Sequence, residues 1–420
     1  MPIDYQAELE VMGQNARKAA RRLALMSAPQ KNQALQAIAE AIREQQETIF
    51  AANALDMKAG EEKGLTSAML DRLRLTPQRI EDMIKGLQTL IGLPDSVGNV
   101  DSTWLRPNGM KIQRIRVPIG VIAIIYESRP NVTVDAGSIC LKAGNAVILR
   151  GGSEAFHSNQ RLAEVMMTAG AASGLPEGTV QLMPWTDRAA IAPLLRMNQY
   201  IDLVIPRGGE GLIRNVVENA TMPVIKHYKG VCHIYVDEKA DFDMALRIIE
   251  NAKCQRPGVC NAVETLLVHK DIAAEFAPRL AELLEKRQVE MRGDAAFCKL
   301  VPQAKLAQEQ DWYEEYLDLI VSIRVVDSLE EAVEHVAKYG SAHSDVIITE
   351  NRKNAAAFTE AVDSAVVYVN ASTRFTDGSE FGMGAEIGIS TDRIHARGPM
   401  GVAELTTYKY VAIGSGQIRE

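Results

Sequence analysis

Short apolar segments that alternate with helical ones constrain the fold of this chain more than any other sequence feature. The middle of the chain has strand-like segments at 146–149, 180–183, 203–205 and 224–225. A further set follows near 265–268, 321–326, 346–349 and 366–369. The helical segment after the first strand has one apolar face and ends at Gly174-Leu175-Pro176, a typical helix stop. Strands and helices that alternate at this spacing predict parallel, doubly wound α/β sheets.

The two ends of the chain depart from this pattern. Residues 1 to about 100 are predicted to be helical, and the capping-box pair Ser27 and Gln30 marks the start of one helix. Asn108-Gly109 is a strong hairpin signal, and alternating basic and apolar residues follow it as far as Val117. The segment 405–413 is also strand-like. These strands are hard to place in either α/β region.

The composition excludes several classes of protein. With 47% hydrophobic and 24% charged residues, the 420-residue chain can bury enough apolar surface for two or three domains. The net charge of -8 argues against a nucleic-acid-binding protein. The first residues show no signal-peptide pattern, and the longest apolar run, 121–126, is far shorter than the roughly 20 residues that span a bilayer. We therefore expect a cytoplasmic protein.

Two glycine pairs follow strand-like segments and suit the binding of a phosphate. They lie in Arg150-Gly151-Gly152-Ser153 and Arg207-Gly208-Gly209-Glu210-Gly211. Parallel α/β sheets bind ligands at the carboxyl ends of their strands, where glycine lets the backbone approach a phosphate and a helix N-terminus favours the anion. Neither segment is a GxGxxG or Walker motif, so a glycine turn without a ligand is the alternative. Because an arginine can hold a 2′-phosphate, Arg150 and Ser153 favour NADP.

Cys260 is the candidate nucleophile among five cysteines. It lies between a Pro-Gly turn and a strand-like segment, with Lys253 and Arg256 nearby in the sequence. Positive charge favours the reactive thiolate. A small buried apolar residue is the alternative for any single cysteine, and it is our interpretation of Cys140, Cys232 and Cys298. Cys254 lies six residues before Cys260, but no second cysteine pair or HxxxH partner accompanies them, so we expect no metal site.

Several long segments together resemble one enzyme family. They are YESRPNVTVD (126–135), LKAGNAVILRGG (141–152), QRPGVCNAVETLLV (255–268), HVAKYGSAHSDVIIT (335–349), VYVNASTRFTDGSEFGMGAEIGIS (367–390) and HARGPMGVAELTTYKY (395–410). In this combination the chain resembles the gamma-glutamyl phosphate reductases, also called glutamate-5-semialdehyde dehydrogenases, of the aldehyde dehydrogenase superfamily. The resemblance covers nearly the whole chain.

The resemblance implies a reaction and a fold. The family reduces L-glutamate 5-phosphate with NADPH to L-glutamate 5-semialdehyde and phosphate, the second step of proline biosynthesis from glutamate. The expected fold is α/β and aldehyde dehydrogenase-like, with two doubly wound parallel-sheet domains plus a small protruding oligomerisation sheet. The expected NADP-binding domain covers 1–103 and 118–232, the catalytic domain covers 233–395, and the oligomerisation strands are 104–117 and 396–420.

The resemblance also implies roles for single residues. Cys260 matches the nucleophile, and Asn131 matches an asparagine whose amide helps to form the oxyanion hole. Glu315 matches a glutamate that binds the nicotinamide ribose. Arg150 matches a lysine that reaches the adenosine ribose, and Ser153 falls near an acid that holds the ribose hydroxyls in NAD-using relatives. The loop after residue 369 matches the one that anchors the substrate, and we expect it to bind through Asn370, Ser372, Thr373 and Arg374.

The substrate carries a carboxylate and a phosphate, so arginines are expected to bind it through paired hydrogen bonds. The candidates are Arg129, Arg256 and Arg374, and a structural salt bridge is the alternative for each. His343-Ser344-Asp345 could be mistaken for a hydrolase triad, but neighbours in sequence do not easily form that geometry, so we expect a structural role.

Two other functions are open to a chain of this kind. The first is a hydrolytic aldehyde dehydrogenase, but the segment 225–230 has no acid at the place of the general-base glutamate of those enzymes. The second is a catalytically silent nucleotide-binding protein, and Cys260 and Asn131 argue against it.

The expected partners follow from the same resemblance. We expect a homodimer or homotetramer, because exposed strand edges favour pairing between subunits. The chain leaves no room for a kinase, so we expect the labile acyl phosphate to be handed over by a glutamate kinase. No nucleic-acid or membrane partner is expected.

Overall fold

The computed structural model describes residues 4–127 and 129–419, so Ser128 of the 126–135 segment lies outside the described residues. Over these ranges the chain divides into two compact units. The first comprises the described residues of Met1–Lys226, Gly382–Gly388 and Met400–Glu420, and the second comprises His227–Phe381 and Ile389–Pro399. Among the described residues, no helix combines the length and the apolar character that crossing a membrane requires.

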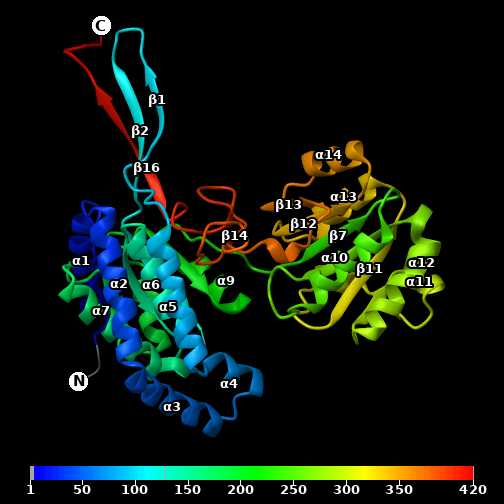
Figure 1. The fold of residues 1–420 in the computed structure, drawn as a ribbon, viewed down its shortest axis with the longest axis horizontal. Helices are drawn as coiled ribbons and strands as arrows, with labels where there is room; N and C mark the ends of the chain where they lie inside the picture. The colour runs from blue at the N-terminus through cyan, green and yellow to red at the C-terminus, as the bar shows by residue number, and fades with distance from the viewer. Residues whose placement is uncertain (1–3, 128, 420) are drawn as a thin grey trace. The chain divides into compact units, whose positions relative to one another are not determined.

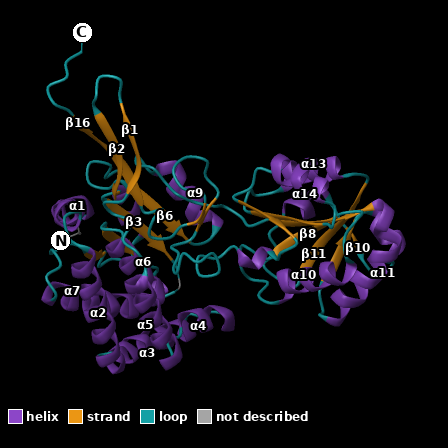
Figure 2. Cartoon of the chain, turned by 45° about the horizontal axis from the view of Figure 1, so that its top comes forward, coloured by secondary structure: helices purple, strands orange, loops and turns teal. Residues whose placement is uncertain are grey.

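Unit 1 combines helices with a parallel sheet and an antiparallel one (Figures 1 and 2). Its helices are α1 (Tyr5–Leu23), α2 (Ala28–Glu44), α3 (Gln46–Glu62), α4 (Ser67–Leu73), α5 (Pro77–Gly92), α6 (Asn131–Lys142), α7 (Phe156–Ala172), α8 (Ile191–Leu194) and α9 (Glu210–Asn219). Its strands are β1 (Val100–Leu105), β2 (Lys111–Pro118), β3 (Val121–Tyr126), β4 (Ala146–Arg150), β5 (Val180–Leu182), β6 (Leu203–Arg207) and β16 (Thr406–Ile413).

The parallel sheet of unit 1 has the order β5-β4-β3-β6. Every residue of β3 and β4 is buried, which explains why both are apolar apart from Arg150 at the end of β4, since a parallel sheet is covered on both faces. The apolar run 121–126 is therefore a central strand. The expected capping box of Ser27 and Gln30 is present at the start of α2. The prediction of a strand at 224–225 is wrong, because Val224 pairs with Val204 only through an isolated bridge.

The antiparallel sheet of unit 1 has the order β1-β2-β16. The β1–β2 turn contains Gly109, whose φ of +83° suits glycine. Strand β16 pairs with β2 from Thr406 opposite Pro118 to Ile413 opposite Lys111. Figure 1 shows this sheet extending away from the rest of unit 1. The two strand-like segments that could not be placed from the sequence, 104–117 and 405–413, thus join in one small sheet.

Unit 2 is a second α/β structure. Its helices are α10 (Phe242–Cys254), α11 (Lys270–Lys286), α12 (Ala295–Leu300), α13 (Leu329–Tyr339) and α14 (Arg352–Ala361). Its strands are β7 (Cys232–Val236), β8 (Val263–His269), β9 (Glu290–Gly293), β10 (Lys305–Leu306), β11 (Ile320–Val326), β12 (Ser344–Ile348), β13 (Val366–Val369), β14 (Ile389–Ser390) and β15 (Gly398–Pro399).

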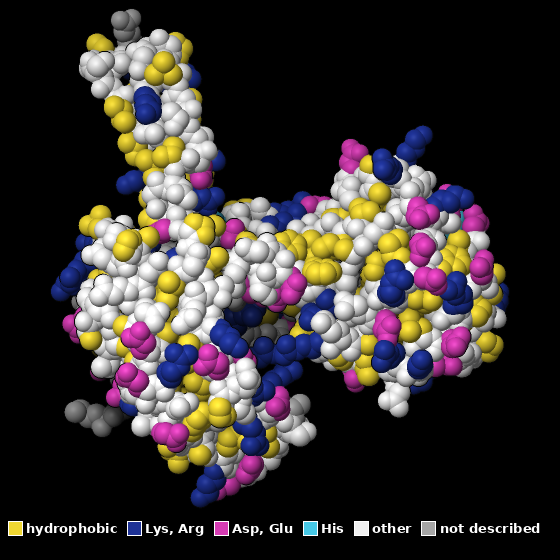
Figure 3. All heavy atoms as spheres, viewed as in Figure 1, with side chains coloured by type: hydrophobic (Ala, Val, Ile, Leu, Met, Phe, Trp, Pro, Cys, Tyr) yellow, Lys and Arg dark blue, Asp and Glu magenta, His cyan; other side chains and the backbone are white. Residues whose placement is uncertain are grey.

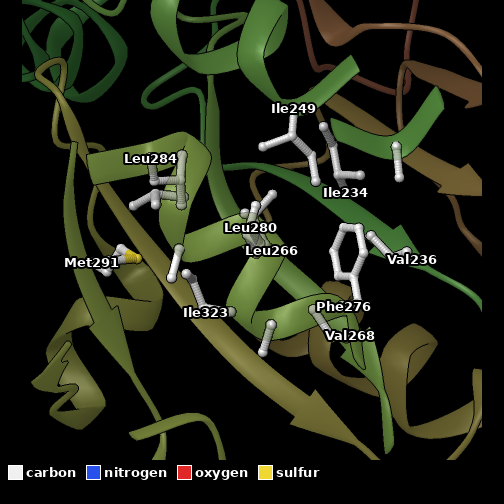
Figure 4. Packing of buried hydrophobic residues seen from close by; sticks show 14 of the residues in the cluster. Ile234, Val236, Ile249, Leu266, Val268, Phe276, Leu280, Leu284, Met291 and Ile323 are labelled. Atoms are coloured by element: carbon white, nitrogen blue, oxygen red, sulfur yellow. The ribbon is translucent and has the colours of Figure 1, made fainter. Parts of the chain in front are cut away.

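The parallel sheet of unit 2, in the order β10-β9-β11-β8-β7-β12-β13, has helices on both faces (Figure 2). Alternate residues of β7 point to opposite faces: Ile234 packs in the cluster with α10 and α11, and Tyr235 packs with α13 and α14. Figure 4 shows Phe276 and Leu280 of α11 in the first cluster. Within the described residues, the predicted fold class of two parallel α/β sheets with a small antiparallel sheet is confirmed.

Candidate active site

Cys260 lies on the loop that joins α10 to β8, and its side chain is partly exposed. Because β8 is buried along its whole length, the loop ends in a fixed central strand. Cys232 Sγ at the start of β7 donates a hydrogen bond to the Cys260 carbonyl oxygen at 3.3 Å. Gly230 packs so closely that a Cβ atom there would lie 1.9 Å from the same oxygen. The backbone of the candidate nucleophile is thus held from the β7 side by a thiol and a glycine.

A buried polar chain continues from Cys232. Its Sγ lies 3.7 Å from His343 Nδ1, which lies 2.9 Å from Ser344 Oγ, and that hydroxyl lies 2.6 Å from Thr376 Oγ1. Burial lowers the pKa of His343 to about 3 and raises the pKa of Cys232 well above its usual value. Both groups are therefore neutral at pH 7, and Cys232 serves as a structural thiol.

His343, Ser344 and Asp345 do not form a catalytic triad. The Asp345 carboxylate accepts the backbone N–H of His233 at 2.9 Å and lies 3.0 Å from His233 Nδ1. His343 therefore receives no orientation from Asp345, and all four side chains are buried.

The 370–377 loop follows β13, and its polar side chains largely shape the loop itself. Asn370 has a φ of +55°, and its amide exchanges two hydrogen bonds of 2.9 Å with the backbone of Thr349. Ser372 Oγ accepts the backbone N–H of Arg374 at 3.2 Å. Thr373 Oγ1 is buried and has no hydrogen-bond partner among the described residues. Thr373 and Arg374 therefore remain the side chains of this loop that can serve a ligand.

Arg374 is attached to the Cys260 loop. Its Nε donates to Gln255 Oε1 at 2.9 Å, and its Nη1 donates to Asn261 Oδ1. Burial and the charge of Arg256 lower the pKa of Arg374, while the charge of Cys260 acts in the opposite direction. The structure thus brings Arg256, Arg374 and Cys260 together in one unit.

Two carboxylates of unit 2 lie close to this loop and are already engaged. Glu315 Oε1 accepts the backbone N–H of Gly230 at 2.9 Å. Glu264 pairs with Lys253 at 2.6 Å, with both side chains fully buried, and burial raises the pKa of Glu264. Lys253, which the sequence placed near Cys260 as a source of positive charge, is therefore neutralised by Glu264.

Asn131 is the first residue of α6 in unit 1, the helix that follows β3 in the chain. Its Nδ2 donates to Asp135 Oδ2, one helical turn later, at 2.7 Å. An amide nitrogen carries two hydrogens, so this contact orients the group and leaves a second donor. Arg129 is exposed and precedes Pro130, the N-cap residue of α6.

Arg150 ends β4 at the carboxyl edge of the unit 1 sheet. It is only 7% exposed and donates from Nη2 to the carbonyl of Thr186 at 2.8 Å. Its Nε is buried without a hydrogen-bond partner among the described residues. A Cβ on Gly151 would lie 2.2 Å from Asn159 Nδ2, so no side chain fits there. Ser153 begins a short 3₁₀ helix, and its Oγ lies 3.4 Å from Glu154 Oε1.

The Gly208-Gly209 turn at the start of α9 already holds an anion of the chain itself. Glu127, directly after β3, accepts the Gly209 backbone N–H at 3.0 Å. A Cβ on Gly208 would lie 2.4 Å from the same carboxylate. A phosphate that used this N–H would have to displace Glu127.

The residues that hold the expected ones in place were not predicted from the sequence. They are Gly230, Gln255, Asn261, Asp135 and Glu127. Gln255 and Asn261 flank Cys260 within the 255–268 segment, and this flanking was the available signal. The contacts of Glu127 and Gly230 join distant parts of the chain and leave no such local signal.

Comparisons with known proteins extend over both units. A family model described as "Aldehyde dehydrogenase family" matches residues 2–319. The "Gamma-glutamyl phosphate reductase" of Moorella thermoacetica is 60% identical over 413 residues, which cover 98% of this chain and 99% of that protein. The crystal structure of the gamma-glutamyl phosphate reductase of Thermotoga maritima has a TM-score of 0.97 at 49% identity, covering 98% of this chain and 100% of that one. An acetylating aldehyde dehydrogenase of Geobacillus thermoglucosidasius shares the fold, with a TM-score of 0.68 at 19% identity over 99% of this chain and 98% of that one.

Proposed function

Because this chain belongs to the gamma-glutamyl phosphate reductases of the aldehyde dehydrogenase family, we propose that it reduces L-glutamate 5-phosphate with NADPH to L-glutamate 5-semialdehyde and phosphate. This is the second step of proline biosynthesis from glutamate. The structural observation that carries the proposal is the Cys260 loop. Its Cys260 side chain is partly exposed, and the next residue, Asn261, binds the guanidinium of Arg374. A thiolate and a guanidinium together suit attack on an anionic acyl compound.

In the proposed mechanism, the Cys260 thiolate attacks the carbonyl carbon, the bond to phosphate breaks, and a thioester forms on Cys260. The backbone N–H of Cys260 and the side-chain amide of Asn131 donate to the oxyanion that develops, and the loss of one such donor typically lowers the rate about 10²–10³-fold. When bound, a nicotinamide cofactor would supply the hydride needed to reduce this thioester to the aldehyde level. Cys260 recovers its thiolate when the aldehyde leaves.

The residues at the carboxyl edge of the unit 1 sheet fit NADPH, so we assign most of the cofactor contacts to unit 1 and the nucleophile to unit 2. Among the described residues, the buried Nε of Arg150 has no hydrogen-bond partner, so it can donate to an anion. Glycine is required at position 151 because a side chain there would clash with Asn159. The proposed cofactor-binding residues are Arg150, Gly151, Ser153, Gly208, Gly209 and Glu315. Replacing Arg150 with serine should weaken NADPH binding, measured by equilibrium titration, more than it weakens NADH binding.

The carboxylate and phosphate of the substrate are proposed to bind to arginines and to the loop after β13. The proposed residues are Arg129, Arg256, Asn370, Ser372, Thr373 and Arg374. Asn370 and Ser372 act by shaping the loop, because their side chains bind the backbone.

A hydrolytic aldehyde dehydrogenase would need a general base to activate water against the thioester. The segment 225–230 carries no acid, and Glu264 and Glu315 are engaged with Lys253 and the Gly230 backbone. Water attack would destroy the thioester of an acyl-phosphate enzyme, so a segment 225–230 without an acid favours phosphate as the acyl acceptor and an acyl phosphate as the donor.

A coupled assay of semialdehyde oxidation tests the function. We expect NADP⁺ reduction that depends on inorganic phosphate and disappears in Cys260→Ala. Acid formation without phosphate would refute the proposal, and so would full activity of Cys260→Ala.

We also propose that the β1-β2-β16 sheet pairs subunits into a homodimer or homotetramer. Figure 3 shows hydrophobic side chains on the surface of this sheet. Its exposed large hydrophobic residues include Val100, Trp104, Leu105, Tyr408, Tyr410 and Ile413. Light scattering coupled to size exclusion should give an assembly that Tyr410→Glu dissociates, and a monomeric wild type would refute this.

The acyl phosphate is labile, so we propose that a glutamate kinase hands it over directly. Hydroxylamine added to the coupled reaction traps free acyl phosphate. Partial protection of semialdehyde formation supports hand-off, and complete interception contradicts it.

A further inference from the structure

Arg374 is a cation whose hydrogen-bonding partners, in the described part of the chain, are neutral. Nε donates to the amide oxygen of Gln255 and Nη1 to the amide oxygen of Asn261. Asp377 and Glu380 act on Arg374 electrostatically, but neither accepts one of these hydrogen bonds. Arginines that only support structure usually pair with a carboxylate, as Arg292 does with Asp311 at 2.7 Å. Amide partners fix the guanidinium in place without cancelling its charge.

Both amides belong to the loop that carries the nucleophile. Gln255 directly follows α10, and Asn261 directly follows Cys260. Asn261 is 5% exposed, and its Nδ2 donates to the Thr376 carbonyl at 2.9 Å. The Asn261 amide is therefore satisfied at both ends, and it ties the 370–377 loop to the Cys260 loop.

The far side of this tie is rigid as well. Thr376 Oγ1 lies 2.6 Å from Ser344 Oγ and 2.8 Å from the hydroxyl of Tyr368. The same buried chain reaches the Cys260 carbonyl through His343 and Cys232. Cys260 and Arg374 are thus anchored to one shared network, so their separation is fixed before a substrate arrives.

We propose that Gln255 and Asn261 are positioning residues that hold Arg374, partly exposed and hydrogen-bonded to neutral amides, as the receptor for the phosphate group that leaves the reacting carbonyl. This inference rests on the proposed acyl-phosphate chemistry and names the group that Arg374 binds. In an acyl phosphate, a single bridging oxygen separates phosphorus from the carbonyl carbon. The carboxylate of the substrate lies at the other end of its carbon chain. Because Arg374 is bound to Asn261, the residue after Cys260, it lies on the side of the phosphate group. The carboxylate of the substrate would then bind to other residues.

A charge-introducing isostere at either amide tests the proposal. Asn261→Asp and Gln255→Glu keep the shape of the two side chains that bind Arg374 but give Arg374 a carboxylate partner. Gln255 is exposed, so Gln255→Glu is expected to fold even if the buried Asn261→Asp does not. Gln303→Glu adds the same charge at an exposed turn of unit 2 and serves as the control.

The first measurement needs no substrate. The rates at which iodoacetate and iodoacetamide alkylate Cys260, followed on its own peptide by mass spectrometry, report the local charge, because only the first reagent is an anion. We expect the iodoacetate-to-iodoacetamide ratio to fall about tenfold or more in both variants and to stay unchanged in Gln303→Glu. The new carboxylate cancels the attraction of Arg374 for the anionic reagent, and the interaction of two unit charges about 4 Å apart near a protein surface is large enough for a change of that size. An unchanged ratio in Gln255→Glu would overturn the proposal, even if the enzyme proved to have another substrate.

The second measurement identifies the bound group. In semialdehyde oxidation, we expect the KM for inorganic phosphate to rise about tenfold or more in Gln255→Glu, with a smaller change in the KM for the semialdehyde, because one charge-assisted contact is lost. A rise confined to the KM for the semialdehyde would assign Arg374 to the carboxylate and overturn the proposal. Activity without any phosphate dependence would refute the proposed function itself. The alkylation ratio would still show whether Gln255 and Asn261 keep the charge of Arg374 available beside Cys260.

Discussion

Replacing Gly230 with alanine should disable the enzyme without touching any reacting atom. The added Cβ would lie 1.9 Å from the Cys260 carbonyl oxygen and 2.7 Å from its Cα, while ordinary contact begins at 3.4 Å. The Cys260 backbone would therefore have to move by about 1.5 Å. Because all the atoms met are backbone, no side-chain rotation can relieve the clash.

The expected size of the effect follows from that shift. A misplacement of about 1 Å at a reacting group can cost about 10²-fold in rate, and overpacking typically costs about 1–3 kcal/mol of stability. We therefore expect the kcat of Gly230→Ala to fall at least about 10²-fold. The rate at which iodoacetamide alkylates Cys260 should fall as well, while the urea transition shifts only by the overpacking cost.

Gly258→Ala is the matched control in the same loop. Its added Cβ would come no closer than 3.6 Å to the Leu317 carbonyl, and Gly258 does not have a positive φ. We expect this variant to keep most of its activity. The reasoning would be refuted if Gly230→Ala kept wild-type kinetics, or if Gly258→Ala lost as much activity as Gly230→Ala.

Three further predictions concern stability and geometry. Lys253→Met should lower the free energy of unfolding, measured in urea, by about 3–5 kcal/mol, because it leaves the buried Glu264 carboxylate without its partner. The double variant Lys253→Met with Glu264→Leu should recover most of this loss. An equal loss in the single and the double variant would contradict the prediction. Burial lowers the pKa of His335 to about 2, so the residue favours folding above pH 6.5 and loses about 1.4 kcal/mol of that stability per pH unit as pH falls towards 2. His335→Phe should therefore flatten the change in urea stability between pH 7 and 5, and an unaltered slope would count against it. Asn131→Ala should lower kcat about 10²–10³-fold, and Asp135→Ala should lower it about tenfold. The double variant should lose little more than Asn131→Ala, because Asp135 acts through Asn131. Losses in initial rate that add up in the double variant would show that Asp135 acts independently of Asn131.

The sequence by itself determined the class of fold and the candidate nucleophile. Strands such as 121–126 and 146–149 are apolar throughout because a parallel sheet covers both of their faces. Helix starts such as Ser27 carry their capping groups within a few residues. The segments around Cys260 resemble their family over long runs. All these signals are local, so they can be recognised without knowing what lies across the structure.

Strands that are stabilised by residues far away in the sequence were not predicted correctly. β7 was not predicted, because Cys232 and His233 interrupt its apolar pattern, and their polar groups are satisfied by residues more than a hundred positions away. In the opposite direction, 224–225 looked like a strand but pairs only through an isolated bridge. A strand exists only where another strand accepts its hydrogen bonds, and the local sequence does not name that partner.

The tertiary structure alone decided which charges are available at the site. Lys253 and Arg374 are both cations in the sequence, but Lys253 is neutralised by Glu264 and Arg374 is held by the neutral amides of Gln255 and Asn261. Asn261 and Arg374 are separated by more than a hundred residues in the chain. Whether a charge is cancelled or offered to a ligand depends on the atoms within a few ångströms of it. Only the folded chain brings those atoms together.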